Sequence, residues 1–329
     1  MATPSPVRLL DLATGYQRSN VLFALIELEI PGLLARGPMT AAQLAVHLGA
    51  DPLATDRFLN ACAALGLLER ERGEFRNSAD VARFLVRGTA TYLGDAFLRY
   101  DRASYPAWAG LAERLRTWRS GETQAPAPST EDEQAAARAQ HELSLLTGEA
   151  LGSAIDFSRH RRLLDLGGGT GAMSIALCRA YTNLTAVVLE RAGVADIARG
   201  CIHDSGLAAR IEVAEGDFAR DPLPAGCDAV LLANLLSIAT PRANQGLLGR
   251  IFDMLPAGGR VLLSGWMLDD GRTSPLLPVL FCLEDINWGA PDVEHTAATY
   301  AAWLQAAGFR DIGRKLYFPP TSVVHGRKP

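Results

Sequence analysis

The chain has 329 residues, of which 48% are hydrophobic and 21% are charged, and this composition is typical of a globular protein with about two domains and a sizeable apolar core. The formal net charge of −4 argues against nucleic-acid binding, which needs a basic face. The sequence contains no run of about 18 apolar residues and no basic head followed by an apolar segment, so we expect neither a membrane span nor a signal peptide.

The first part of the chain predicts a winged helix. Apolar residues recur at helical spacing in residues 7–35. Thr40 and Asp51 are each well placed to cap a helix, and a glycine follows each of these two helices. Two short strands are expected around Arg72-Gly73. Helix, turn, helix and hairpin together make the winged-helix pattern.

A winged helix that binds DNA offers Lys and Arg to phosphates from its second helix. Here that helix offers Asp51, Asp56 and Arg57, and most of its length is apolar. We therefore expect residues 1–90 to form a winged-helix dimerisation domain, with a second copy of the chain as partner and no nucleic acid.

Residues 91–158 predict a helical connector that is rich in aromatic side chains. Tyr105 and Trp108 are candidates to line a substrate cleft. Aromatic residues at helical spacing also serve as ordinary core packing, and the sequence leaves both interpretations open.

Residues 159–329 show short buried strands that alternate with helices. This pattern indicates a Rossmann-like, doubly wound sheet of mostly parallel strands. Two further strands around Pro319-Pro320 predict an antiparallel hairpin at the end of the sheet. The predicted fold class is therefore α/β, preceded by an α-helical winged-helix domain.

The sequence RLLDLGGGTGA, residues 162–172, predicts a strand, a tight glycine turn and a helix. Glycines allow the backbone to approach a ligand closely, and the helix start offers free N–H groups. Gly167, Gly169 and Ala172 also satisfy the dinucleotide pattern G-x-G-x-x-A, so a nicotinamide enzyme is a genuine alternative.

Two acidic positions accompany the glycine turn. Glu190 ends the second strand, where a carboxylate can bind the ribose hydroxyls of an adenosine, and Asp217 with Phe218 follows the third strand, where they suit the adenine amino group and ring face. The glycine turn also lies in mid-chain, behind a helical half. Together these features favour S-adenosylmethionine (SAM) over a nicotinamide cofactor.

On these motifs the chain resembles the SAM-dependent small-molecule O-methyltransferases of the caffeate and hydroxyindole type, in their bacterial natural-product branch. The resemblance covers nearly the whole length and includes LLDLGGGTG, the acid at 190, GDF, PAGGRVLLS and YAAWLQAAGF. It implies a cytoplasmic homodimer that binds SAM, or its product S-adenosylhomocysteine, in the C-terminal domain. The implied cofactor residues are Gly167, Glu190, Asp217 and Phe218; Glu190 replaces the family's usual Asp.

The resemblance also implies a small aromatic or polyketide-type substrate, bound between the domains and against helices such as those near Phe281 and Trp288. The chain departs from the family in its catalytic loop. Ser237 stands where the family has its histidine base, and Gly265 stands where a glutamate orients that histidine. A third family acid is retained as Glu294.

Two other histidines are candidates to replace the base. His295 follows the retained acid, and His141 lies on the helix before the cofactor domain, where it is also a candidate substrate contact. A lone histidine is equally an ordinary surface or packed residue. The histidines show no metal-ligand spacing, so we expect no metal, and the five cysteines form no CxxC pair, which indicates free thiols in a reduced compartment.

The missing base does not exclude methyl transfer. A general base contributes roughly 10²–10⁴-fold, whereas holding two reactants in line reaches effective molarities of about 10⁵–10⁸ M. We therefore expect a SAM-dependent tailoring enzyme of secondary metabolism that transfers a methyl group by proximity. The alternative is a repurposed homologue that binds SAM or S-adenosylhomocysteine and catalyses hydroxylation, decarboxylation or a cyclisation.

Overall fold

The computed structural model describes residues 5–89, 91–119, 129–288 and 296–329. The chain divides into two compact units, Met1–Pro106 and Ala107–Pro329. The segment expected as a connector is thus shared, with residues 91–106 belonging to the first unit and the remainder to the second. None of the helices in the described ranges combines the length and the apolar character that crossing a membrane requires.

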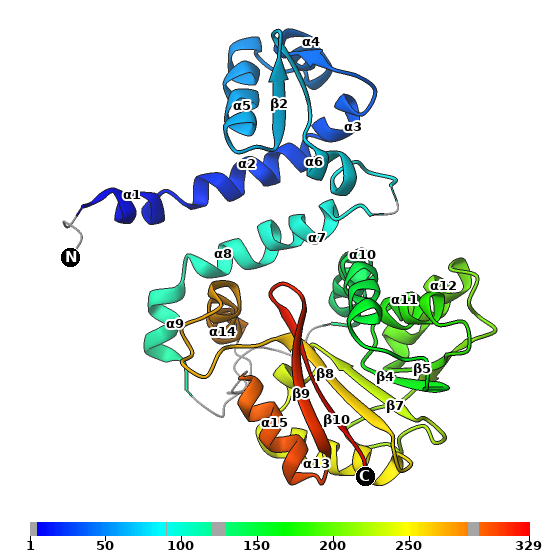
Figure 1. Cartoon of the computed structure of the whole chain (residues 1–329). Helices are drawn as coiled ribbons and strands as arrows, with labels where there is room; N and C mark the ends of the chain where they lie inside the picture. Colours follow the sequence, from blue (N-terminus) through cyan, green and yellow to red (C-terminus); the bar gives the residue numbers. More distant parts are fainter. Residues whose placement is uncertain (1–4, 90, 120–128, 289–295) are drawn as a thin grey trace. The chain divides into compact units, whose positions relative to one another are not determined.

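The first unit is mainly helical (Figure 1). Its helices are α1 (Val7–Ala13), α2 (Tyr16–Glu27), α3 (Ile30–Leu34), α4 (Ala41–Leu48), α5 (Pro52–Ala64), α6 (Ala79–Phe84) and α7 (Gly94–Arg99), followed by a π-helical turn, Tyr100–Ser104. The single helical stretch expected over residues 7–35 is three helices. Glu29, at a left-handed φ of 52°, separates α2 from α3, which begins at Ile30 and has Pro31 in its first turn.

The predicted winged helix is present. Thr40 caps α4 through a capping box, and the Asp51 carboxylate accepts from the Ala54 N–H at the start of α5. Strands β2 (Leu68–Glu71) and β3 (Glu74–Asn77) pair in antiparallel fashion around Arg72-Gly73, both at positive φ. A short strand that the sequence did not predict, β1 (Met39–Thr40), adds to β3.

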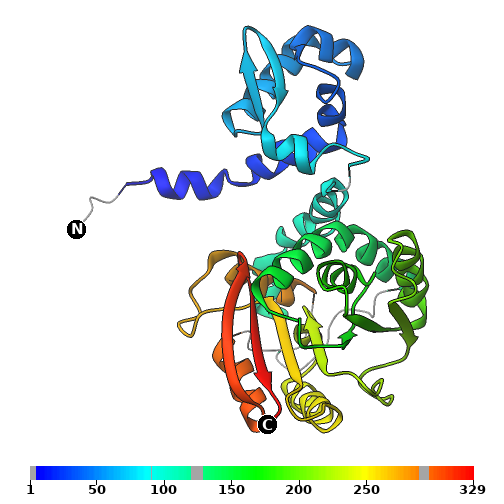
Figure 2. The same cartoon turned by 45° about the vertical axis from the view of Figure 1, so that its right-hand side comes forward.

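The second unit is built on one seven-stranded sheet (Figure 2). Its strands are β4 (Arg162–Leu166), β5 (Thr185–Glu190), β6 (Ile211–Glu215), β7 (Ala229–Ala233), β8 (Arg260–Trp266), β9 (Arg310–Phe318) and β10 (Thr321–Arg327). The strand order is β6-β5-β4-β7-β8-β10-β9, with the first five strands parallel and β10 antiparallel to both its neighbours. The expected parallel sheet and terminal hairpin are confirmed.

Helices cover both faces of this sheet. They are α10 (Thr130–Ala154), α11 (Ala172–Ala180), α12 (Ala192–Asp204), α13 (Pro241–Met254) and α15 (Ala297–Ala306). The second unit also contains α9 (Leu111–Thr117) and α14 (Leu276–Trp288), and α8 (Tyr105–Trp108) lies at the boundary of the units. One apolar core contains residues of α10, α11 and α12, and the other contains residues of α13 and α15. The sheet is therefore buried on both sides, as a parallel sheet requires.

Helix α10 lies unusually close to α11. A Cβ added to Gly148 would stand 2.8 Å from the Ala176 Cβ and 3.0 Å from the Met173 Cα. One turn further on, a Cβ at Gly152 would stand 3.3 Å from the Leu177 Cδ2. The two glycines therefore fix the distance between these helices.

We predict that Gly148→Ala destabilises the protein by about 1–3 kcal/mol, because overpacking a tight contact outweighs the better helix propensity of alanine. Gly200→Ala is the matched control. Gly200 lies in α12, and a Cβ there meets nothing within 4 Å, so this substitution should stabilise by about 0.5–1 kcal/mol. Urea unfolding of both variants checks this, and equal shifts would show that Gly148 does not set the spacing.

Candidate functional site

The glycine turn after β4 needs glycine at several positions. Gly167, Gly169 and Gly171 have φ of 63°, 58° and 74°, a region that costs other residues roughly 1–2 kcal/mol. A Cβ at Gly167 would stand 2.7 Å from the Leu235 Cδ1, whereas a Cβ at Gly169 meets nothing within 4 Å. The turn is thus packed on one side and open on the other.

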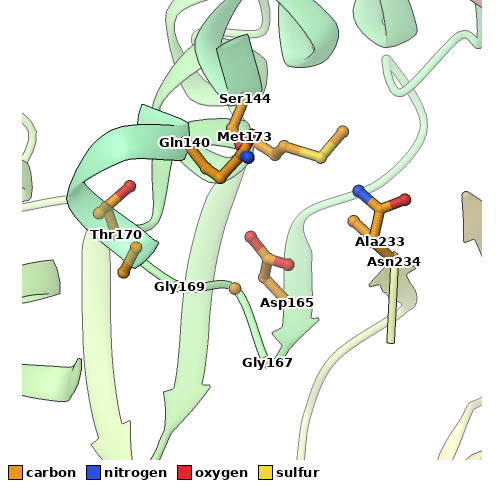
Figure 3. A pocket seen from close by; sticks show the side chains of 11 residues that line it. Gln140, Ser144, Asp165, Gly167, Gly169, Thr170, Met173, Ala233 and Asn234 are labelled. Carbon is orange, nitrogen blue, oxygen red and sulfur yellow. The ribbon is translucent and has the colours of Figure 1, made fainter. Parts of the chain in front are cut away.

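A pocket lies on the open side of the turn, among α10, α11 and the carboxyl ends of β4 and β7. Its cavity volume is about 100 Å³, and the pocket is partly open to solvent. Besides the turn glycines, its lining includes Gln140, Ser144, Asp165, Thr170, Met173 and Asn234. Figure 3 shows these side chains around the space beside Gly169.

Asp165 is the most unusual group in this pocket. It is 1% exposed, and its Oδ2 accepts a hydrogen bond of 2.7 Å from the Ser174 hydroxyl, while its Oδ1 has no hydrogen-bond partner in the part of the chain that the structure describes. Burial raises the pKa of Asp165 to about 6, although the Ser174 bond acts in the opposite direction. A buried carboxylate with one free oxygen is suited to a positively charged or hydrogen-bond-donating ligand group.

Glu190 ends β5 beside the same turn. Its Oε1 accepts from the Gly169 N–H at 3.0 Å and its Oε2 accepts from the Arg191 N–H at 2.9 Å. Burial raises the pKa of Glu190 and outweighs these two N–H donors, which lower it. The structure therefore brings together Glu190 and Gly169, which were both predicted to bind the cofactor.

Asp217 and Phe218 lie just after β6. The Asp217 Oδ1 accepts from the Ala219 N–H at 2.9 Å, and its side chain is 42% exposed. Phe218 packs against the sheet core, and its carbonyl accepts from Arg250 at 2.6 Å. Neither residue belongs to the lining of the pocket beside Gly169.

His141 contacts the glycine turn from α10. Its Nδ1 lies 2.7 Å from the Thr170 hydroxyl, and Thr170 is 3% exposed and lines the pocket. Burial, together with the positive charge of Arg179, lowers the pKa of His141 below its ordinary value, so the imidazole is neutral near pH 7. A neutral imidazole in this position can hold Thr170 in place.

The loop that carries Ser237 begins directly after β7, in a 3₁₀ turn over Leu236–Ile238. The Ser237 hydroxyl lies 3.5 Å from the carbonyl of Asn234, a pocket residue at φ 52°. Asn244 is 2% exposed and holds the loop by donating to the carbonyls of Leu236 and Ala239, at 2.8 and 3.2 Å.

Gly265 lies next to this loop on β8. A Cβ there would stand 3.4 Å from the Asn234 Oδ1. The position therefore faces the pocket residue Asn234 but carries no side chain that can orient a base. Neither Ser237 nor Gly265 offers a proton acceptor that titrates near neutral pH.

The predicted aromatic residues lie in different places. The Trp108 Nε1 donates to the Glu284 carboxylate on α14, and Phe281 on the same helix packs edge-on against Trp266 at 5.2 Å between ring centroids. Tyr105 belongs to the first unit, where its hydroxyl accepts from Asn20 at 3.0 Å. Glu294, His295 and the side chain of Trp288 lie outside what the structure describes.

Sequence reasoning missed most of the side chains that line the pocket. Asp165 had a readable signal, since a single acid interrupts the buried strand RLLDL just before the glycines. Gln140, Ser144 and Met173 had none, because only the packing of α10 on α11 brings them to the turn.

The chain matches two family models. Residues 93–310 match the model described as an O-methyltransferase domain, and residues 10–88 match the model described as an O-methyltransferase dimerisation domain.

Two proteins of known activity are similar over most of their length. The chain is 34% identical over 333 residues to the 3-hydroxy-5-methyl-1-naphthoate 3-O-methyltransferase of Streptomyces sahachiroi, covering 98% of this chain and 95% of that protein. It is 32% identical over 315 residues to the N,N-dimethyltransferase OxyT of Streptomyces rimosus, covering 92% and 90%.

The fold is also similar to the crystal structure of human N-acetylserotonin methyltransferase in complex with SAM. The TM-score is 0.87 at 29% sequence identity, over 99% of both chains.

We predict that Asp165→Asn stabilises the ligand-free protein at pH 7.5. The folded pKa of about 6 lies above the ordinary value of 3.8, so the folded state binds more protons than the unfolded state between these values. Wild-type stability therefore falls as pH rises through this window, and the neutral amide avoids a loss of about 1–3 kcal/mol.

Urea unfolding at several pH values measures the difference between the two proteins. It should be largest above pH 6 and shrink toward pH 4. Exposed Asp270→Asn serves as the control and should show no such trend. An Asp165→Asn variant that is less stable than wild type at every pH would contradict the assignment.

Proposed function

The chain belongs to the O-methyltransferase family, and from this premise we propose that it is a SAM-dependent tailoring enzyme of secondary metabolism that transfers a methyl group without a base from the Ser237 loop. The observation that carries the proposal is the pocket beside the glycine turn, with a free Asp165 oxygen inside it and no titratable side chain at position 237 or 265.

The residues present fit the cofactor. Gly169 leaves open space where any side chain would intrude. The Glu190 carboxylate accepts hydrogen bonds from two backbone N–H groups, and the hydroxyls of a ligand can donate to it beside them or in their place. The free Oδ1 of Asp165 suits the positively charged end of the cofactor. We further propose that Asp217 and Phe218 bind the adenine.

When bound, SAM supplies a methyl group on a positively charged sulfur, which is a good leaving group. The chain's own contribution is to hold the two reactants in line and to exclude water. Positioning of this kind reaches effective molarities of about 10⁵–10⁸ M, so it exceeds the roughly 10²–10⁴-fold that a general base adds. A base matters most for a neutral phenol, whose pKa is about 10.

The acceptor site is proposed to lie along α14. Asn287 on this helix is 2% exposed, and neither polar atom of its side chain has a hydrogen-bond partner among the described residues. It follows Glu284, the partner of Trp108, by one helical turn. A buried amide without partners is rare in folded proteins and suits a polar group of a bound molecule. Trp108, Phe281 and Trp288 remain proposed aromatic contacts. Tyr105 remains a substrate contact proposed from the sequence.

His141, Glu294 and His295 remain proposed functional residues, and a contact in the structure bears on the first of them. The contact with Thr170 favours a role for His141 at the glycine turn. Glu294 and His295 keep the role proposed from the sequence, near the acceptor.

The chain is further proposed to act as a homodimer through its first unit. Four apolar residues of α1, Val7, Leu9, Leu10 and Leu12, are 65–69% exposed. Side chains of this kind are usually covered when they gather on one short helix. A second copy of the dimerisation domain is the covering partner that fits.

Incubation with methyl-labelled SAM tests the proposed reaction. An aromatic carboxylate, an acidic phenol, an aromatic amine and a plain phenol serve as acceptors, and we expect label in products of the first three well above the plain phenol at pH 7. Acceptor turnover with SAM left intact would instead support hydroxylation, decarboxylation or cyclisation, and would contradict methyl transfer.

Gly169→Val tests the pocket in the same assay, because its side chain enters the open space beside the turn. Gly206→Val is the matched control, since Gly206 also has a positive φ, 75°, with nothing within 4 Å of an added Cβ. We expect about a hundredfold loss of SAM affinity by calorimetry for Gly169→Val only, because the valine side chain fills part of the ligand site. Equal affinities would overturn the placement of the cofactor.

A further inference from the structure

A pair of hydroxyl groups lies on the sheet, one strand away from the pocket residue Ala233. The Tyr317 hydroxyl and the Ser264 Oγ are 2.6 Å apart. Tyr317 comes from β9, the outermost strand, and Ser264 comes from β8, with β10 between them. The Tyr317 side chain therefore reaches across β10 toward the centre of the sheet, on the face that packs against α10 and α11.

The strand register relates Ser264 to a residue of the pocket. Ser264 pairs with Ala233 in the parallel β7–β8 ladder, and Ala233 lines the pocket. Register partners on neighbouring strands point to the same face and lie about 4.8 Å apart. The Asn234 N–H also donates to the Ser264 carbonyl at 2.9 Å. The pair thus lies at the carboxyl ends of the strands, where open α/β sheets bind ligands.

The pair has one hydroxyl proton to spare. Two hydroxyls carry two protons, and the bond between them uses one. Within the described part of the chain, the bond between them is the one hydrogen bond that either hydroxyl makes. Burial raises the pKa of Tyr317 to about 12, so the phenol stays protonated and remains a donor at neutral pH.

We propose that the Tyr317–Ser264 pair donates a hydrogen bond to an ionised oxygen of the acceptor, and that the acceptor is therefore a carboxylate or an acidic phenol. The inference rests on the proposed methyl transfer. It also explains how the site works with Ser237 in place of a base, because an acceptor that binds as an anion has no proton to remove.

The electron balance of the step is simple. The acceptor oxygen uses a lone pair to form the new O–C bond, and the C–S bond of the cofactor breaks with its electrons staying on sulfur. The negative charge on oxygen and the positive charge on sulfur disappear together. Tyr317 and Ser264 keep their protons throughout. A hydrogen bond to a charged group favours the anion by roughly 10–100-fold.

A nitrophenol that changes colour on ionisation tests the proposal without turnover. Its pKa is read by absorbance on the protein saturated with S-adenosylhomocysteine. In wild type we expect the pKa of the bound nitrophenol to lie below its value in water. Tyr317→Phe should raise that pKa by about one unit, which is tenfold in the anion's population. Ser264→Ala is a second variant and should raise it in the same direction.

Tyr181→Phe is the matched control. Tyr181 is also a partly buried tyrosine, but its hydroxyl donates to the Gly152 carbonyl at 2.7 Å, away from the strand ends. It should leave the nitrophenol pKa unchanged, and binding of S-adenosylhomocysteine confirms that each variant is folded.

The role of the hydroxyl pair and the methyl transfer are tested by different outcomes. A nitrophenol that does not bind, or that titrates alike in wild type and Tyr317→Phe, overturns the role of the hydroxyl pair. A pKa shift that depends on Tyr317, without transfer of labelled methyl, keeps the anion site and refutes the methyl transfer.

Discussion

The structure depends on one constraint, the left-handed glycine turn at the point where the strand order reverses. Strands β5 and β6 lie on one side of β4, and β7 and β8 lie on the other. Chain connections leave toward both sides, so a crevice opens above the end of β4. Gly167 must be small because Leu235 fills the space beside it, and Gly169 must be small because the crevice opens there. Gly148 sets the close approach of α10 to α11, and both helices contribute residues to the lining of the pocket.

This geometry gives Asp165 its unusual state. A carboxylate with one free oxygen is held almost completely out of water, which is unfavourable for the folded protein on its own. Such strain is expected where a bound ligand supplies the missing partner. The same end of the sheet carries the Tyr317–Ser264 hydroxyls and the Ser237 loop, to which Asn244 donates two hydrogen bonds. An anionic acceptor and a cationic cofactor then make a base unnecessary.

Much of the fold could be predicted from the sequence, and less of the site. The winged helix could be predicted from local signals such as the cap at Thr40 and the turn at Arg72-Gly73, because caps and turns depend on residues only a few positions apart. The glycine turn and Glu190 were predictable for the same reason. Gln140, Met173 and the Tyr317–Ser264 pair were not, because tertiary packing joins residues that are far apart in the chain. The break at Glu29 was missed because helical periodicity continues across it.

The most direct test of the account is single-turnover methyl transfer by Ser237→Ala to an aromatic carboxylate, measured from pH 6 to pH 9. The account predicts a rate within about threefold of wild type and the same pH profile, since the serine hydroxyl removes no proton. A loss of roughly 10²–10⁴-fold, the usual contribution of a general base, would contradict it.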